Sequence, residues 1–542
     1  MTSRIIMLAV LVLVQTNHFV THQKGNQIMY QNHSIQQDTV LSSTVGGNVE
    51  DNIVHSPINV IPKAAKLLTQ CLDVKRSQVE INQQPIKPVV NLLQHQVVTP
   101  VKPNRLYYYL HGYDDFLRQT LVSGFKFGFH VNNFKFVSTD RDNNSKSACI
   151  DPSVVDQKIS KECKMGRVWG PLESSPYTDY VISPLGLRPK KQPGEFRVIH
   201  NLSHPIGSSV NDGIPREFAT VKYATVSDAI SHILSFGSGA FLAKTDIKSA
   251  YRIVPVHPSD YRLFGFKWKG SYYFDKCLPM GCASSCQIFE MFSSSLEWIV
   301  KQHIVGAKVI HVLDDFLFIG PSEIICQRAL DTFIKICEDI GVPLAPEKTE
   351  GPSQVLTFLG IQLDTKTMCA SLPEDKVEKF SNMIHEFMLC KSVTLTRIQS
   401  LCGMLNFLCS IIVPARAFIR SLYSLQVGVA KPYYKVKITN SVKKDLAVWQ
   451  SFLKGYNYKT FFLDFKWRTS EHLQLFTDAA STIGFGAIFN NKWTYGLWDE
   501  TCFGLNIALL ELYPIVLAFY LWGEEFKNQC IIINKSTCQY AA

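Results

Sequence analysis

The chain has 542 residues, of which 46% are hydrophobic and 12% aromatic, so it can bury several cores. Its net charge of +10 is compatible with a nucleic-acid partner but is too modest for this length to indicate one. Its 15 cysteines follow no paired pattern with zinc-ligand spacing, which argues against a zinc site and favours a reduced, intracellular protein.

The first fourteen residues, MTSRIIMLAVLVLV, disagree with an intracellular protein. Arg4 is followed by an apolar run that is too short to span a bilayer and is typical of a secretory signal peptide. Asn32 and Asn143 lie in glycosylation sequons, although such triplets are common by chance. A secreted glycoprotein is therefore an alternative that depends on this signal-like start alone.

Large anchoring residues are scarce before residue 105. Between Thr21 and Arg105 the only aromatic residue is Tyr30, and a segment of this composition buries too little surface to fold. We therefore expect a signal-like start and a mostly disordered region over residues 1–104. Aromatic and aliphatic residues then crowd together, and we expect a helical lead-in segment over residues 105–164, interrupted by the polar loop STDRDNNSKS.

Short apolar runs between Gly and Pro residues predict mixed helices and strands up to about Thr365. From Pro373 onward, apolar residues recur at three- and four-residue spacing, as in PEDKVEKFSNMIHEFM, which predicts helices. Near the end, LQLFTDA, TIGFGAIF and KWTYGLW predict three successive strands. ALLELYPIVLAFYLWG predicts a helix, and CIII predicts a fourth strand.

Residues 311–320, HVLDDFLFIG, place Asp314 and Asp315 side by side in an otherwise apolar run. Two carboxylates about 4 Å apart repel by roughly 4 kcal/mol at an effective dielectric constant near 20. Burial of both without a partner is more unfavourable still. We expect two short strands that meet here in a tight hairpin, with both carboxylates at the edge of the sheet and a positive partner nearby. A solvated turn is the alternative for this stretch by itself.

The stretch FLAKTDIKSAYRIVPVHP, residues 241–258, predicts a strand that ends at Asp246. By itself this aspartate is typical of a helix cap. Together with the hairpin it supplies three carboxylates, the hard oxygen ligands that Mg²⁺ prefers. Two Mg²⁺ ions about 3.5–4 Å apart can activate a hydroxyl and stabilise a leaving oxygen. The sequence therefore predicts a site for two Mg²⁺ ions, or Mn²⁺ in their place, at Asp246, Asp314 and Asp315.

Several motifs, which follow one another along the chain in the order that the family has them, resemble those of retrotransposon reverse transcriptases. TDIKSAY is similar to the first catalytic motif of that family, and VLDD is similar to its YxDD box. LPMGCASS, residues 278–285, is similar to the LPxGxxxS motif that shapes the nucleotide pocket, and EKT and FLG are similar to later motifs of the palm and primer grip. SPLGLRPKK, RVIHNLS and TDAASTIGFGA look most like DIRS-type elements, with gypsy-like LTR elements next.

This resemblance implies an α+β fold, in which a right-hand polymerase with fingers, palm and thumb precedes a partial ribonuclease-H-like α/β domain. Fingers and palm would occupy residues 165–371. A helical thumb and connection would occupy residues 372–468, and a truncated ribonuclease-H-like domain would occupy residues 469–542.

The resemblance also implies residues that bind the nucleotide. The hairpin RPKKQPGEFRVIHNLS would cover the triphosphate with Lys190 and Arg197, whose charged groups suit phosphate oxygens; a solvated basic hairpin is the alternative. Tyr251 matches an aromatic gate that collides with a ribose 2′-OH, although a core tyrosine fits the same pattern. Lys348 would protonate the departing pyrophosphate unless it is an ordinary surface lysine.

Two positions depart from the family pattern. Val312 stands where the YxDD box has tyrosine, and Met280, next to Gly281 in the nucleotide pocket, stands where many retroviral relatives have glutamine. The second change replaces a polar contact near the base pair by a flexible apolar one. Both changes would affect fidelity more than activity, because the predicted metal ligands are retained.

The C-terminal unit resembles a ribonuclease H domain with an incomplete site. LFTDAA supplies Asp478 at a strand end, and ALLELYP supplies Glu511 on a helix. Relatives carry an Asp followed by Asn at the end of the next strand, whereas Ile533 precedes Asn534 here. Two carboxylates hold two divalent ions less well than three or four. We therefore expect ribonuclease H activity to be lost.

The expected function is RNA-directed DNA synthesis, in which deoxynucleotides are added to a primer 3′-OH by two-metal phosphoryl transfer. The expected partners are an RNA template, a DNA or RNA primer and deoxynucleoside triphosphates, and no membrane is expected. The alternative is a decayed or co-opted retroelement fragment that binds nucleic acid without synthesis.

Overall fold

The computed structural model describes the chain between residues 97 and 532, with short gaps at 141–143, 190–193, 456–458, 463–466 and 527–529. Helices and mainly antiparallel sheets are mixed throughout these residues, so the predicted α+β fold is confirmed. Several predictions fall outside the described residues: those on the signal-like start, Asn32, Asn143, Lys190 and Ile533.

Helices open the described part, as expected for the lead-in segment. They are α3 (Pro103–Tyr109), α4 (Asp115–Phe127), α5 (Lys146–Ile150) and α6 (Pro152–Lys164). The Asp114 side chain accepts a hydrogen bond from the Leu117 backbone N–H at 2.9 Å and so caps α4.

Ordered structure begins earlier than the sequence indicates. The composition places residues 97–104 in the mostly disordered region, yet Val101 is buried and the Lys102 backbone N–H donates to the Ile340 carbonyl at 2.7 Å. Val101 and Leu106 share one apolar core with Ile340. Residues 97–104 are ordered because a few apolar residues next to a large core can bury themselves against it without aromatic anchors.

Two small antiparallel sheets follow. The first has the order β1-β6-β5, with β1 (Val168–Leu172), β6 (Ser271–Asp275) and β5 (Gly265–Trp268). The second is the predicted basic hairpin, in which β2 (Leu185–Pro189) pairs with β3 (Phe196–His200). Arg188 lies opposite Arg197 in this pairing.

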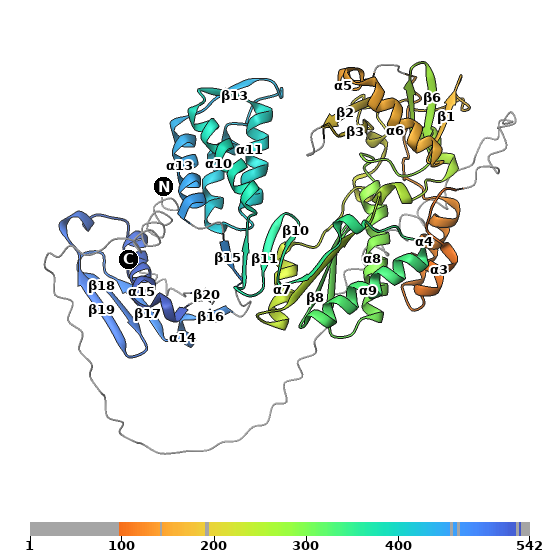
Figure 1. The fold of residues 1–542 in the computed structure, drawn as a ribbon. Coiled ribbons are helices and arrows are strands. Elements are labelled where there is room, and N and C mark those ends of the chain that lie inside the picture. Colours follow the sequence, from red (N-terminus) through yellow and green to blue (C-terminus); the bar gives the residue numbers. More distant parts are fainter. Residues whose placement is uncertain are drawn as a thin grey trace, which may run out of the picture. The chain divides into compact units, whose positions relative to one another are not determined.

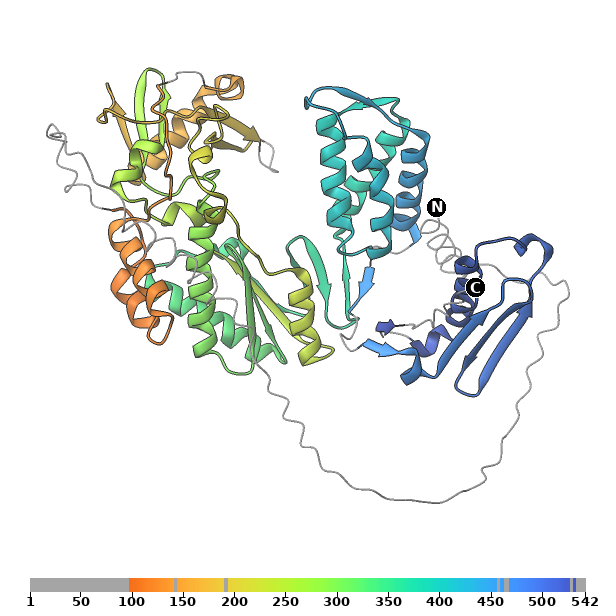
Figure 2. The ribbon, with the colours of Figure 1, turned by 180° about the vertical axis from the view of Figure 1, so that it is seen from behind.

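A four-stranded antiparallel sheet with the order β7-β8-β4-β9 positions the candidate site. Its strands are β7 (Lys308–Val312), β8 (Asp315–Gly320), β4 (Phe241–Asp246) and β9 (Glu350–Ser353). Helices cover both faces (Figures 1 and 2). They are α8 (Ser285–His303) and α9 (Glu323–Ile340) on one face and α7 (Val226–Phe236) on the other.

The side chains of β8 alternate between the two cores. Phe316 and Phe318 pack with α8 and α9, whereas Leu317 and Ile319 pack with α7. Successive side chains of a strand point to opposite faces, so a strand covered on both sides is apolar at every position. This arrangement explains the continuous apolar run after Asp315.

A second sheet and a helical bundle follow. The sheet has the order β10-β11-β12-β15, with β10 (Val355–Phe358), β11 (Ile361–Asp364), β12 (Cys369–Ser371) and β15 (Lys459–Phe461). The helices are α10 (Glu374–Leu389), α11 (Leu395–Leu408), α12 (Arg420–Ser424) and α13 (Asn440–Gly455). A short pair joins β13 (Ser392–Thr394) to β14 (Lys435–Lys437). The helices predicted after Pro373 are therefore present.

The last described elements match the predicted three strands, helix and fourth strand. They are β17 (Leu475–Ala479), β18 (Gly484–Phe489), β19 (Lys492–Leu497), α15 (Ile507–Trp522) and β20 (Cys530–Ile532). The sequence does not predict β16 (Trp467–Thr469), which pairs in parallel with β20, because three residues show no periodicity. The short helix α14 (Ser470–Leu473) connects β16 to β17.

The helix α15 is unusually apolar. Residues 507–526 are long and apolar enough, by length and composition alone, to cross a membrane. In the structure, Leu510, Ala518 and Trp522 are buried on the side of α15 that contacts β17 and β18.

Candidate active site

The three predicted metal-binding aspartates meet at one end of the central sheet. Asp246 is the last residue of β4 and Asp315 is the first residue of β8, and the two are paired across the strands. The same Asp315 pairs with Val312 on β7, which leaves Leu313 and Asp314 as a two-residue turn. The predicted hairpin is therefore present, and its carboxylates lie where the central strands end.

The turn is strained at Leu313, whose φ of +54° lies in the left-handed region. An L-residue adopts this conformation at a cost of roughly 1–2 kcal/mol, and such strain gathers at functional sites. The Ile247 backbone N–H donates to the Asp314 carbonyl at 3.0 Å, which ties the turn to the end of β4. The two acidic stretches therefore fold against each other through the backbone as well as through the register.

Negative charge is in excess at this site. Desolvation, followed by the charges of Asp314 and Asp246 and a hydrogen bond to Asp246, raises the pKa of Asp315 to about 6. Burial and the Asp246 charge likewise raise the pKa of Asp314. Carboxyl groups that are difficult to ionise together favour the binding of a cation, because a positive charge relieves their mutual repulsion.

Two positive groups partly balance these charges. Lys348 Nζ lies 2.6 Å from Asp246 Oδ2, and the Asp246 carboxylate raises the pKa of the lysine against the opposing effect of desolvation. Arg197 of β3 lies close enough to lower the pKa of Asp314, as Lys348 also does. Lys348 is exposed but pairs with a predicted metal ligand that is only 6% exposed, and its role as a proton donor stays a prediction.

The donor set fits a hard divalent cation, since it consists of three carboxylates in one place with raised pKa values at two of them. In the described part of the chain, no group of three or more His, Cys, Asp or Glu side chains is already arranged as a metal cage. At this site, Asp246 is instead engaged by Lys348 and Asp315.

Tyr251 lies close to the aspartates, on the 3₁₀ turn Ala250–Ile253 that follows β4. Its hydroxyl lies 3.2 Å from Cys286 Sγ, and its ring packs against Phe289 with 5.2 Å between centroids. Burial, then Cys286, and to a smaller extent the Asp314 charge raise the tyrosine pKa. The two interpretations of Tyr251 are thus compatible, because a ring anchored on the core lies within the field of the acidic site.

The loop that carries Met280 and Gly281 is exposed at its tip, with Met280 48% exposed. Gly281 has φ +104°, a conformation that favours glycine. The Asn211 side chain holds the loop on both sides, by donating to the Gly281 carbonyl at 2.9 Å and accepting from the Ala283 N–H at 2.8 Å. Sequence reasoning missed Asn211. The Asn-Asp-Gly triplet signals a turn, but it does not indicate that this turn meets a loop 70 residues away.

The C-terminal carboxylates are arranged differently. Asp478 is exposed on β17, whereas its neighbour Ala479 is buried together with Leu510 of α15. Alternation along the strand therefore places Asp478 on the face opposite to α15, the helix that carries Glu511. The prediction for Ile533 lies outside the described residues.

Residues 188–363 match the family model described as reverse transcriptase (RNA-dependent DNA polymerase). This stretch contains the three aspartates, Tyr251 and Lys348. The chain carries a reverse transcriptase domain. The resemblance drawn from the sequence motifs is thereby confirmed, while the assignment to DIRS-type elements stays a prediction.

Known relatives of the reverse transcriptase domain are retroviral polyproteins. The Pro-Pol polyprotein of feline foamy virus is 25% identical over 231 residues, which cover 42% of this chain and 19% of the polyprotein. The Gag-Pro-Pol polyprotein of Mason-Pfizer monkey virus is 23% identical, with 39% of this chain and 12% of the polyprotein covered. The chain thus spans a fifth or less of the length of these relatives.

Solved structures of foamy viral protease-reverse transcriptase are also similar. One, the dRH form in complex with ds DNA, has a TM-score of 0.49 at 14% identity and covers 84% of each chain. Another, in complex with an RNA/DNA hybrid, has a TM-score of 0.47 at 17% identity and covers 84% of this chain and 59% of that chain.

Proposed function

We propose that the chain is an RNA-directed DNA polymerase, which extends a primer paired with an RNA template by transferring deoxynucleotides to the primer 3′-OH. One observation carries this proposal. Asp246 and Asp315 are paired on adjacent strands, with Asp314 beside them, inside the matched reverse transcriptase domain. The whole reaction depends on placing and neutralising charge, which three convergent carboxylates can organise.

Asp246, Asp314 and Asp315 would hold the divalent ions, Mg²⁺ or in its place Mn²⁺. When bound, two such ions favour attack by a hydroxyl on a phosphate and neutralise the departing pyrophosphate. The raised pKa values of Asp314 and Asp315 support this role, because a bound cation relieves the repulsion that raises them.

Lys348 would hold a proton for the leaving group. Its ammonium is paired with Asp246, so it lies beside the carboxylates that would hold the divalent ions and close to where the pyrophosphate would leave. The raised pKa keeps Lys348 protonated near neutral pH, as a proton donor to the pyrophosphate oxygen requires. Arg197, whose charge already acts on Asp314, would face the phosphates from the basic hairpin.

Tyr251, Met280 and Gly281 would shape the nucleotide pocket. The tyrosine ring is anchored by Phe289 and its hydroxyl by Cys286, so the ring cannot swing away to admit a ribose 2′-OH at low energetic cost. Deoxynucleotides should therefore be preferred. The exposed Met280 offers a flexible apolar contact where many retroviral relatives have a polar one.

The test is extension of a DNA primer on an RNA template in Mg²⁺ or Mn²⁺. We expect extension by the unaltered chain and a loss of at least about a thousandfold in Asp314→Asn, because an amide cannot replace an anionic ligand. Tight binding of the template–primer without extension, over a range of salt and metal concentrations, would instead support a fragment that only binds nucleic acid.

Loss of ribonuclease H activity is a second part of the proposal. It is supported by Ile533 at the position where relatives have Asp, which leaves Asp478 and Glu511 as the two carboxylates of the predicted site. A labelled RNA strand in an RNA–DNA hybrid should stay intact with the purified chain. Degradation that disappears in Asp478→Asn would contradict this part and leave the polymerase proposal untouched.

A further inference from the structure

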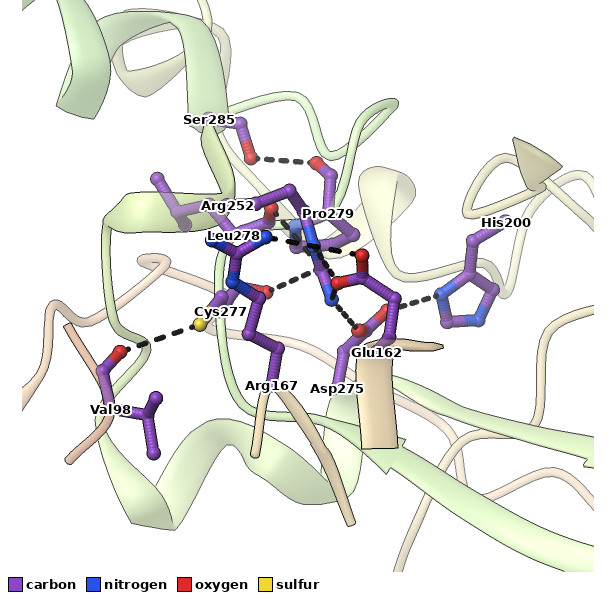
Figure 3. Close-up of polar contacts among 10 residues, drawn as sticks. All are labelled: Val98, Glu162, Arg167, His200, Arg252, Asp275, Cys277, Leu278, Pro279 and Ser285. Atoms are coloured by element: carbon purple, nitrogen blue, oxygen red, sulfur yellow. Dashed lines mark hydrogen bonds and ion pairs between the residues drawn. The ribbon is translucent and has the colours of Figure 1, made fainter. Parts of the chain in front are cut away.

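Arg252, the residue after Tyr251, lies at the centre of a buried ionic network (Figure 3). Its Nη2 donates to Asp275 Oδ1 at 2.7 Å and to Glu162 Oε2 at 2.9 Å, and its Nε donates to the same Glu162 oxygen at 3.1 Å. Its Nη1 lies 3.3 Å from the Cys277 carbonyl. Residues from α6, the end of β6 and the segment after β6 therefore converge on one guanidinium.

This guanidinium has no donor left for a substrate. Arginine carries five N–H groups, and the fifth contact runs from Nη1 to the Leu278 carbonyl at 3.5 Å. The side chain is only 15% exposed. A cationic residue beside the predicted sugar gate would otherwise be a candidate phosphate ligand, but the N–H groups of Arg252 all contact acceptors of the protein.

Cys277 and Leu278, whose carbonyls contact Arg252, come just before the loop with Met280 and Gly281. The Leu278 N–H donates to the Val254 carbonyl at 2.9 Å, so the loop begins against the turn that carries Tyr251 and Arg252. At the other end, Ser285 Oγ donates to the Pro279 carbonyl at 3.1 Å (Figure 3). Arg252 thus connects the turn that carries Tyr251 to the backbone that directly precedes Met280.

The turn before Arg252 needs such an anchor. Ser249 has φ +62°, a left-handed conformation that is unfavourable for residues other than glycine. The Arg252 backbone N–H donates to the Ser249 carbonyl at 2.7 Å and closes this turn. A strained backbone persists only where its surroundings hold it, so the buried side chain of Arg252 helps to keep Tyr251 in place.

The network also reaches the basic hairpin. Asp275 Oδ2 lies 3.4 Å from Nδ1 of His200, the last residue of β3, which also carries Arg197. Burial opposes ionisation of Asp275, but the charge of the Arg252 guanidinium outweighs it and holds the pKa of Asp275 below its usual value. The ionised Asp275 therefore links Arg252 to the strand that carries a predicted phosphate ligand.

We infer that Arg252 is a positioning residue that sets sugar selectivity, because it fixes Tyr251 and the Met280–Gly281 loop at a set separation. This inference rests on the proposed polymerase function. Arg252 acts through Tyr251, so its loss should weaken rejection of ribonucleotides and raise the KM for deoxynucleotides, while binding of the template–primer is unchanged.

The test measures single-nucleotide addition by the full chain with a deoxynucleotide and with the matching ribonucleotide. Arg252→Met keeps most of the side-chain volume and removes the charge. We expect the ratio of kcat/KM for the deoxynucleotide to kcat/KM for the ribonucleotide to fall at least tenfold, through a higher KM for the deoxynucleotide and a higher kcat/KM for the ribonucleotide. Arg252→Lys keeps the charge without the fork geometry and should be intermediate.

A double variant separates positioning from general damage. If Arg252 acts through Tyr251, adding Arg252→Met to Tyr251→Ala should lower the selectivity ratio no further than Tyr251→Ala alone. The matched control is Arg105→Met, which removes an arginine paired with Asp339 on α9, and its ratio should equal that of the unaltered chain. If Arg252→Met does not fold, Glu162→Gln removes one negative charge from the network and should lower the ratio in the same direction.

The outcomes are distinguishable. A selectivity ratio within twofold of the unaltered chain in folded Arg252→Met or in Glu162→Gln, or a loss that adds fully to that of Tyr251→Ala, would overturn the inference and leave the proposed function standing. If the unaltered chain adds no nucleotide at all, the proposed function is overturned and the inference falls with it.

Discussion

The carboxylate of Asp315 shows how this site differs from an ordinary strand end. Desolvation and two neighbouring carboxylates raise its pKa to about 6, so at neutral pH the domain holds negative charges that repel one another. A group whose pKa is raised on folding contributes stability below its ordinary pKa, and that stability is lost as the pH rises through the folded value. Without a cation, Asp315 therefore weakens the fold at pH 8.

We predict that Asp315→Asn is more stable than the unaltered chain and inactive. In the presence of a chelator at pH 8, the melting temperature should rise by roughly 1–3 °C, because the amide removes the repulsion. At pH 4 the gain should vanish, since the carboxyl is then protonated. Thermal melting at both pH values is the measurement, and an Asp315→Asn variant that melts lower at pH 8 would contradict the account of the charges.

His311 on β7 is a second residue whose charge matters. It is buried, its Nδ1 contacts Glu297 of α8, and its Nε2 lies 3.2 Å from Glu290 Oε1 of the same helix. Burial opposes a charge on the ring, but hydrogen bonds and attraction from Glu290 and Glu297 outweigh it and raise the pKa of His311 to about 9. The imidazolium therefore fastens the strand before the Asp314 turn to α8.

The corresponding prediction is a loss of stability between about pH 6.5 and 9. A raised histidine pKa stabilises the fold below 6.5, and the contribution, about 3 kcal/mol at most, disappears as the pH passes the folded value. Denaturant titrations at pH 6, 7.5 and 9.5 should show a steeper decline for the unaltered chain than for His311→Gln. The exposed His111→Gln serves as the control and should decline like the unaltered chain.

At the scale of elements, the hairpin with the two aspartates could be predicted because β8 is covered on both faces. Phe316 and Leu317 pack in different cores, so charged residues fit only at the end of this strand. The Arg252–Asp275 contact could not be predicted in the same way. Its partners lie on different elements, and a single arginine or aspartate in the sequence gives no signal of the residue that it will meet.

The end of α9 gives a prediction at this scale. Gly341 ends the helix with φ +89°, and a Cβ there would lie 2.2 Å from the Pro100 carbonyl oxygen. Gly341→Ala therefore combines an unfavourable φ with a clash against backbone that belongs to the segment before α3. Gly270 has φ +79° with open space around it, so it isolates the conformational effect.

We expect Gly270→Ala to lower the free energy of unfolding by about 1 kcal/mol and Gly341→Ala by at least about 1 kcal/mol more. Denaturant midpoints of the two variants give the comparison. Equal losses would show that the segment around Pro100 does not pack on α9.

Across the whole molecule, the order of the motifs predicted the positions of the strands and helices better than composition predicted where ordered structure begins. The strand ending at Asp246, the hairpin and the helices after Pro373 are all where the sequence indicates. Composition misplaced the start of ordered structure, because it does not register a few apolar residues such as Val101 that pack on a distant core. The strand β16 was missed because its three residues are too few to show a periodicity, and its partner β20 is 63 residues away in the pairing of Trp467 with Cys530.

In the proposed polymerase, residues from two distant stretches of the chain form one cation-dependent site. The most direct measurement is the rate of a single deoxynucleotide addition to a primer on an RNA template, compared among the unaltered chain, Asp246→Asn and Asp331→Asn. Asp331 is exposed on α9 and serves as the control. We expect addition that requires Mg²⁺ or Mn²⁺, a loss of at least about a thousandfold in Asp246→Asn and no change in Asp331→Asn. Addition by Asp246→Asn at the rate of the unaltered chain would contradict this proposal.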